Sequence, residues 1–376
     1  MAQVVKCSKK PCVEKHTGMS VYPAQYALQP LQKGDSEDES DDGEVVKISP
    51  EPMPENLAGM TIAVAARDLH RMALGAPPTY VFLKVSRITL TCALLWMAYS
   101  AQIFLIVATK TLVTPYQVSR TRKVYNDYET MMYTDDAGVA HTYTTANGYN
   151  RGLGEEFFEV SRFSKFSDDD KRSICSIPMS QPYFFMTIVL IWSLRVLSST
   201  RVYMLMTSRL FLPCSVKYTA AYSEILEDGD DGAQVIAGMP LCLKLAIFIF
   251  VLLPNFLISA ALLYLGSRFL ASDSGFDGIL LDAIVLEFIL QLPDLLYSTT
   301  APLRTQLETT STLLKPLYED QGASCLTYYL SFLQLFAAIV WVLLYVLVLQ
   351  TVLPDYKWDV RASCNDYLAN LLARPA

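Results

Sequence analysis

The 376-residue chain is poor in the residues and motifs that most catalytic sites need. Its three histidines, at positions 16, 70 and 141, form no HExxH pair and share no helix face with another metal ligand. A CxxC pair, a GxSxG elbow, a Walker loop and a kinase signature are all missing. A basic patch with interleaved aromatic residues is missing as well, which argues against a nucleic-acid partner. We therefore expect no enzyme, no resident cofactor or metal ion, and no nucleic-acid binding.

Charged residues are also scarce: they make up 18% of the chain, whereas apolar residues make up 52%. The apolar excess is concentrated in a few long runs, which predicts a polytopic protein that contacts the lipid bilayer. The net charge of −7 comes from the stretch 35–44, which holds seven acids and no base. This stretch predicts a disordered tail in which Ser36 and Ser40, each followed by acids, are candidate phosphorylation sites.

The N-terminus has no apolar region typical of a cleavable signal peptide, so the first hydrophobic span is expected to act as the insertion signal. Lysine and arginine counts are similar on the two sides of the spans and do not set the orientation. We place the acidic N-terminus in the cytosol, and with four spans the C-terminus is expected there too. The sequence does not indicate which membrane is involved.

Four apolar runs predict membrane-spanning helices. The run 88–108 has no charge over twenty-one residues, 183–205 is interrupted by Arg195, and 245–265 and 328–353 are strongly apolar. The resulting fold class is all-α, with a disordered acidic tail at 1–55 and a juxtamembrane amphipathic helix at 56–85. The four spans are expected at 86–109, 182–206, 241–267 and 326–353. The remaining segments are expected to be an extracytosolic loop at 110–181, a cytosolic loop at 207–240, an acidic helix and connecting segment at 268–325, and a cytosolic tail at 354–376.

The two polar segments around the first span have their own patterns. The residues flanking the turn "DDAG" (135–138) are β-branched and aromatic, which predicts a β-hairpin. A lone hairpin is marginal in water, so we expect it to pack on a neighbouring helix or on a second copy of the chain in a homo-oligomer. The amphipathic stretch 56–74 fits either a helix on the membrane surface or one packed on another segment, and Pro77 and Pro78 end it.

The stretch 278–298 predicts an apolar helix with acids inside it. At 100° per residue, Glu287, Gln291 and Asp294 fall within about 60° of one another, whereas Asp282 points to nearly the opposite side. Pro293 interrupts the helix near its end, so we expect a short re-entrant or interfacial helix between the last two spans. Its layout resembles that of pore-loop cation channels in arrangement only, because no filter-like sequence follows it.

The spans contain further polar and helix-breaking residues. Arg195 fits either a side chain that reaches the headgroups or an ion pair with an acid on a neighbouring helix. Pro254 and Asn255 fit either a packing kink or a hinge, and Pro293 is a second hinge candidate. In the four-span arrangement Cys175 and Cys325 are the only extracytosolic cysteines, and we expect them to form a disulfide or to remain free thiols.

Two functions fit these patterns. The first is a channel or transport subunit that moves a cation or proton along a pathway with Asp282, Glu287, Gln291, Asp294 and Arg195 as candidates. The alternative is a membrane scaffold or sensor that binds partners through its acidic tail and its Tyr-rich loop. Solvent access to the acids separates them, because a scaffold needs no polar path through the membrane.

Overall fold

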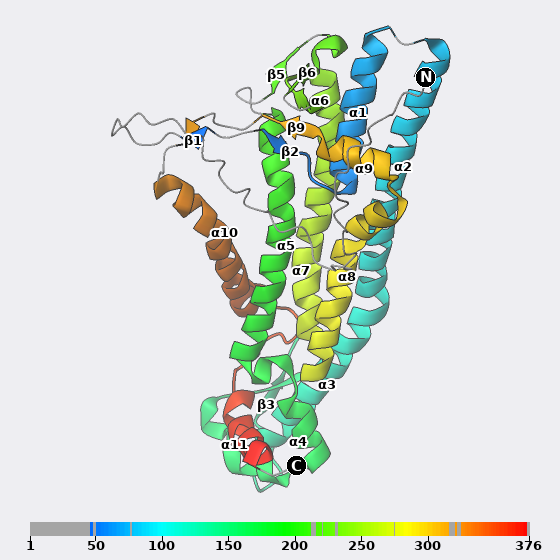
Figure 1. Cartoon of the computed structure of the whole chain (residues 1–376). Helices are drawn as coiled ribbons and strands as arrows, with labels where there is room; N and C mark the ends of the chain where they lie inside the picture. Colours follow the sequence, from blue (N-terminus) through cyan, green and yellow to red (C-terminus); the bar gives the residue numbers. More distant parts are fainter. Residues whose placement is uncertain are drawn as a thin grey trace, which may run out of the picture. The chain divides into compact units, whose positions relative to one another are not determined.

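A computed structural model describes residues 46–47, 50–75, 77–211, 216–219, 221–229, 232–273, 275–315, 320–321 and 325–373 of the chain. The acidic stretch 35–44, with Ser36 and Ser40, lies outside these residues. The described part is mainly helical (Figure 1). Four of its helical stretches are long and apolar enough to cross a membrane, which supports an integral membrane protein: Pro78–Met132, Pro182–Phe211, Leu241–Ser272 and Phe332–Leu349.

The first span is longer than the sequence predicted. Helix α2 (Pro78–Ala108) continues through the π-helical turn η1 (Thr109–Val113) into α3 (Thr114–Met132), giving a helical stretch of 55 residues. The expected loop therefore begins after Met132 and not at residue 110. The reason is a helical period in α3, which buries Tyr125, Tyr128 and Met132 on one side.

The predicted hairpin is displaced along the chain. Strand β3 (Thr142–Thr144) pairs antiparallel with β4 (Asn150–Gly152), so that Thr142 lies opposite Gly152. The arm expected before the turn 135–138 belongs to α3 instead, and only an isolated bridge joins Thr134 to Ala140 across that turn. The alternation of β-branched and aromatic residues was a weaker signal than the helical burial pattern of α3.

The second, third and fourth predicted spans correspond to long helices. They are α5 (Pro182–Phe211), the continuous series α6 (Leu241–Ile247), η7 (Phe248–Leu252) and α7 (Leu253–Ser272), and α10 (Cys325–Leu344) with η8 (Tyr345–Leu349). Helices α5 and α7 approach closely at Gly266, where a Cβ atom would lie 2.6 Å from the indole nitrogen of Trp192.

Helix α8 (Phe276–Thr300) is a fifth long helix, so the re-entrant or interfacial helix expected between the last two spans is longer than predicted. Its 25 residues extend about 37 Å, enough to cross a bilayer core of roughly 30 Å. It lies alongside α2 and α7 for most of their length (Figure 1). One face exposes large apolar side chains, including Leu281 (65% exposed) and Phe288 (61%). Comparable faces occur on the other long helices, as expected for a belt in contact with lipid.

One end of the helix bundle carries α1 (Leu57–Ala73), α9 (Leu303–Thr310) and a four-stranded sheet (Figure 1). Every residue from Leu57 to Asp68 is buried, so α1 packs on other segments of the chain. This is one of the two alternatives predicted for the stretch 56–74. Buried Asp68 lies 2.9 Å from Lys84 of α2, an ion pair that ties α1 to the first span. The sheet order is β2 (Glu51–Pro52), β9 (Thr312–Leu314), β7 (Gln234–Ile236) and β6 (Leu226–Asp228).

Strand β2 corrects the predicted boundary of the N-terminal tail at residue 55. Glu51 lies opposite Leu314 in the antiparallel pair of β2 and β9, and Met53 is 1% exposed. The chain therefore joins the packed structure before the predicted boundary. Two further strand pairs are short: β1 (Val46–Lys47) with β10 (Asp320–Gln321), and β5 (Lys217–Tyr218) with β8 (Gly238–Met239).

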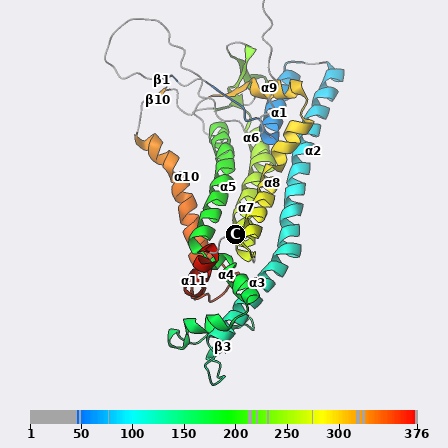
Figure 2. The same cartoon turned by 60° about the horizontal axis from the view of Figure 1, so that its bottom comes forward.

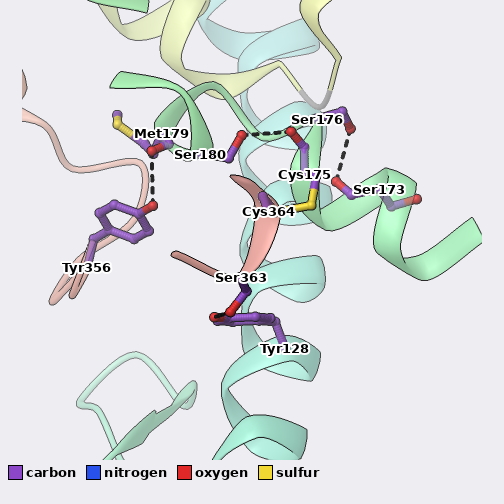
Figure 3. Close-up of a disulfide and its surroundings, with 9 residues drawn as sticks. All are labelled: Tyr128, Ser173, Cys175, Ser176, Met179, Ser180, Tyr356, Ser363 and Cys364. Atoms are coloured by element: carbon purple, nitrogen blue, oxygen red, sulfur yellow. Dashed lines mark hydrogen bonds between the residues drawn. A yellow bond between two sulfur atoms is a disulfide. The ribbon is translucent and has the colours of Figure 1, made fainter. Parts of the chain in front are cut away.

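The other end of the bundle carries the segment 133–181 and the last described helix, α11 (Val360–Ala373) (Figure 2). A disulfide between Cys175, at the end of α4 (Asp168–Cys175), and Cys364 of α11 joins the two segments (Figure 3). The predicted pairing of Cys175 with Cys325 is therefore wrong. The four-span arrangement places residue 364 on the cytosolic side and so separates it from Cys175. Helices α1 and α11 lie at opposite ends of the bundle (Figure 1).

Candidate functional site

Two charged side chains from different long helices form an ion pair midway along the bundle. The Nε–H of Arg195 on α5 donates a hydrogen bond to Oε1 of Glu287 on α8 at 2.7 Å. The two side chains are 32% and 31% exposed. Of the two alternatives for Arg195, the structure therefore contains the ion pair with a neighbouring acid.

Three further polar residues surround this pair. Gln291, one turn along α8, donates its amide N–H to the same Glu287 oxygen. Asp294 of α8 interacts electrostatically with both Arg195 and Glu287. Tyr203 of α5 in turn interacts electrostatically with Asp294. The acidic stripe predicted from the sequence thus lies beside α5.

Asn255 of α7 completes this group, because its side chain lies beside Tyr203. Asn255 is 7% exposed, and its Nδ2 atom is buried without a hydrogen-bond partner in the described part of the chain. We call the full set the polar cluster: it consists of Arg195, Tyr203, Asn255, Glu287, Gln291 and Asp294. It contains one cationic side chain and two carboxylates.

The ion pair of the polar cluster, Arg195 with Glu287, lies far from either end of its helices. Arg195 follows the start of α5 by about 20 Å and Glu287 follows the start of α8 by about 17 Å, at 1.5 Å per residue. Both helices run in the same direction through the bundle (Figures 1 and 2). The ion pair therefore joins side chains at matching depth, among the exposed apolar side chains of the long helices.

Asp282 does not belong to the polar cluster. Its Oδ2 accepts a hydrogen bond from Nε2 of Gln117 on α3 at 3.4 Å. The Oε1 of Gln117 accepts in turn from the hydroxyl of Ser272, the last residue of α7, at 3.0 Å. Asp282 thus lies near the start of α8 and away from the other acids, which agrees with its predicted helix face, and its contacts link three helices.

Polar side chains of α2 donate hydrogen bonds to backbone carbonyls beside the two prolines that were predicted as hinges. Pro293 lies inside α8 and has no N–H to donate to the carbonyl of Ile289, four residues earlier. Buried Gln102 supplies the missing hydrogen bond, donating its Nε2–H to that carbonyl at 2.9 Å. Pro254 follows the π-helical turn η7, and Tyr99 donates its hydroxyl to the carbonyl of Val251 there at 2.7 Å.

These contacts favour the packing-kink interpretation for Pro254, because buried hydrogen bonds hold the irregular turn. Sequence reasoning missed Tyr99 and Gln102. Both lie in the uncharged run 88–108, and their spacing of three residues, which puts them on one helix face, was the available signal.

A second charged cluster is buried at the end that carries α11. Glu129 of α3 is fully buried, accepting hydrogen bonds from the hydroxyl of Tyr125 and, at 2.7 Å, from the backbone N–H of Gly152. Fully buried Arg151 stacks on the ring of Tyr125 at 4.5 Å. Burial and the nearby Glu129 carboxylate raise the pKa of Asp359 to about 7.

Among the described residues, no group of three or more His, Cys, Asp or Glu side chains is arranged to hold a metal ion. Comparison of the chain with protein-family models, with curated proteins and with solved structures found no match.

Proposed function

We propose that this chain is an integral membrane protein of five crossing helices that moves a cation or a proton along the polar cluster. The observation that carries the proposal is the ion pair of Arg195 with Glu287 midway along apolar helices, with a second carboxylate, Asp294, about two turns further along α8. Ionisable side chains at such a depth cost at least a few kcal/mol each. They are rare in membrane helices, and where they occur they commonly mark an ion or proton pathway.

The charge balance of the polar cluster favours a cation over an anion. Arg195 neutralises Glu287 through the 2.7 Å contact. Among the described residues, no basic side chain forms an ion pair with Asp294 within 4.0 Å, although Arg195 interacts with it electrostatically. A proton or a bound cation would neutralise the carboxylate of Asp294. Movement of that proton or cation between Asp294 and Glu287 would be one step of transport.

The disulfide supports an orientation. Disulfides persist in oxidising compartments, so we place the end with Cys175 and Cys364 on the extracytosolic side. The end with α1 and the four-stranded sheet then faces the cytosol. This orientation agrees with the predicted cytosolic position of the N-terminal side, but it places the C-terminal helix α11 on the extracytosolic side.

A flux assay tests the proposal. Purified protein in liposomes should carry protons or monovalent cations down a gradient, measured with a pH-sensitive or ion-sensitive dye inside the vesicles. Asp294→Asn should lower the rate about tenfold or more, because it removes the carboxylate without an ion-pair partner. Asp282→Asn is the matched control on the same helix and should leave the rate within twofold.

Absence of flux in wild-type liposomes, or equal rates in wild type and Asp294→Asn, would refute transport through the polar cluster. A second function is favoured by one observation: Asp294 lies on the exposed surface of the single chain. A scaffold that assembles with a second copy or another membrane helix would cover this carboxylate. Cysteine cross-linking between copies at position 295 together with absent flux would support the scaffold.

A further inference from the structure

A pocket of about 280 Å³ lies among α2, η1, α3, α7 and α8, and none of the polar-cluster residues lines it. The turn η1 and α3 form one wall, and α7 and α8 form the others. The tip of the β3–β4 hairpin contributes Tyr149. The pocket is thus built by segments that are far apart in the chain, and an irregular π-helical turn lines it, a feature frequent at functional sites.

The lining changes in character along the pocket. Ile106, Leu262 and Ile289 contribute the apolar part, which lies toward the middle of the bundle. Arg122 and Arg268 contribute charge toward the end that carries the hairpin. Leu262 and Arg268 are on the same helix and about 9 Å apart along it, at 1.5 Å per residue. The pocket is therefore amphipathic, with its cationic end outermost.

Three cationic side chains line the pocket: Lys110, Arg122 and Arg268. In the described part of the chain, none of them forms an ion pair with a carboxylate within 4.0 Å. The Nε of Arg268 is buried and has no hydrogen-bond partner among the described residues. Unpaired cations beside an apolar cavity favour a ligand that supplies a negative charge.

Arg122, at the cationic end of the pocket, is held in place by backbone carbonyls and an aromatic ring. Its Nε and Nη2 donate hydrogen bonds to the carbonyls of Val352 and Thr351, each at 2.7 Å, and its guanidinium lies 5.8 Å from the ring of Tyr149. These contacts fix the charge without neutralising it, because carbonyl oxygens carry no net charge. Arg122 is therefore a positioned cation, whereas Lys110 is exposed and adaptable.

We propose that this pocket binds an anionic amphiphile, with a phosphate or carboxylate headgroup at Lys110, Arg122 and Arg268 and a hydrocarbon chain along Leu262, Leu286 and Ile289. A volume of about 280 Å³ is slightly below that of most ligand pockets, which span roughly 300–1,000 Å³. It accommodates a headgroup and the first part of a chain, and the rest of a lipid extends between the helices into the bilayer. This site is independent of the proposed transport function.

The test titrates detergent-solubilised full-length protein with four probes: dioctanoyl phosphatidic acid, decanoate, dioctanoyl phosphatidylcholine and inorganic phosphate. Thermal unfolding and native mass spectrometry report binding. We expect the two anionic amphiphiles to raise the melting temperature and remain bound as adducts, and the zwitterionic lipid and free phosphate to do neither at the same concentration.

Two double variants locate the site. Lys110→Gln with Arg268→Gln should weaken the apparent affinity for phosphatidic acid about tenfold or more, because charge-assisted hydrogen bonds are lost. The matched control is Arg120→Gln with Lys123→Gln, which removes two exposed cations of α3 that do not line the pocket. The control should bind as tightly as the wild type.

A phosphatidic acid with a photoreactive group on its chain gives a second readout in the wild-type protein, independent of how the variants fold. Its cross-links should map to α7 and α8 near Leu262 and Leu286. Equal stabilisation by inorganic phosphate would reduce the site to an ion site and refute the amphiphile. Equal binding by phosphatidylcholine, equal loss in both double variants, or cross-links spread over all exposed helices would overturn the proposal.

Discussion

At the scale of single residues, the irregular turns of the long helices depend on polar side chains of α2. The carbonyl of Ile289 and the carbonyl of Val251 each accept a hydrogen bond from a buried α2 side chain, Gln102 and Tyr99 respectively. An unsatisfied carbonyl in an apolar interior costs about 1–3 kcal/mol. Helix α8 can therefore pass through Pro293 and remain a long helix.

Gln102→Leu tests this contribution. The substitution keeps a similar volume and leaves the Ile289 carbonyl without its donor, so we expect the free energy of unfolding to fall by about 1–3 kcal/mol. Denaturant titration of the protein in a mild detergent, followed by circular dichroism, measures the change. Ser100→Ala, at an exposed position of the same helix, is the control and should change stability by less than about 0.5 kcal/mol. A loss in the control as large as that in Gln102→Leu would contradict the assigned role.

Asp359 gives a pH-dependent prediction at the residue scale. Its pKa in the folded protein is raised to about 7, above the reference value of about 3.9 for an unfolded chain. The folded state thus binds more protons than the unfolded state between these two values. Stability should accordingly fall as the pH rises from about 4 to 7, and the full cost should remain above pH 7.

Asp359→Asn should remove this component, because the amide carries no titrating proton. We expect the variant to lose less stability than the wild type between pH 5 and pH 8, measured by thermal unfolding in the same detergent. Identical pH profiles for the two proteins would show that Asp359 does not contribute.

At the scale of elements, the sequence predicted the helices whose apolar runs lack acids. The runs in α5, α7 and α10 were recognised, with boundaries shifted by a few residues. Helix α8 was underestimated because its acids and Pro293 reduced its apparent hydrophobicity and continuity. The compensating partners, Arg195 and Gln102, lie far away in the chain and their contacts could not be read from local pattern.

The candidate site was predictable in part for the same reason. Helical periodicity placed Glu287, Gln291 and Asp294 on one face and Asp282 on another, and the contacts of these residues follow that division. The contributions of Tyr203 and Asn255 depend on how α5 and α7 pack, which is a property of tertiary structure. The hairpin was mispredicted for the same reason. Tyr125 and Tyr128 are buried against α11 and the residues before it, and these tertiary contacts favour a helix in α3 where a strand was expected.

Helix α11 depends on its covalent attachment. The Cys175–Cys364 bond joins positions 189 residues apart. Cys364→Ser should therefore destabilise the end of the bundle that carries α11 by about 2–5 kcal/mol, and expose α11 to limited proteolysis. Cys242→Ser, which replaces an exposed free thiol, is the control and should have no effect. Equal protease resistance of Cys364→Ser and wild type under oxidising conditions would rule out a role for the bond in holding α11.

At the scale of the whole molecule, the position of α8 decides the arrangement. With α8 as a crossing helix, the bundle has an odd number of crossings, α1 and α11 face opposite sides, and the polar cluster lies at mid-membrane. With α8 on the surface, the crossings would be even, and Glu287 and Asp294 would contact water. Transport along the polar cluster and the orientation set by the disulfide both depend on the first arrangement.

The most direct test labels the two ends of α8 with a membrane-impermeant thiol reagent. Gly275→Cys and Thr300→Cys are introduced one at a time into a chain whose unpaired cysteines are replaced, and sealed vesicles of known orientation are labelled before and after permeabilisation. We predict that position 275 is labelled from the extracytosolic side only and position 300 from the cytosolic side only. Labelling of both positions from the same side of sealed vesicles would contradict a crossing α8, and with it the mid-membrane location of the polar cluster.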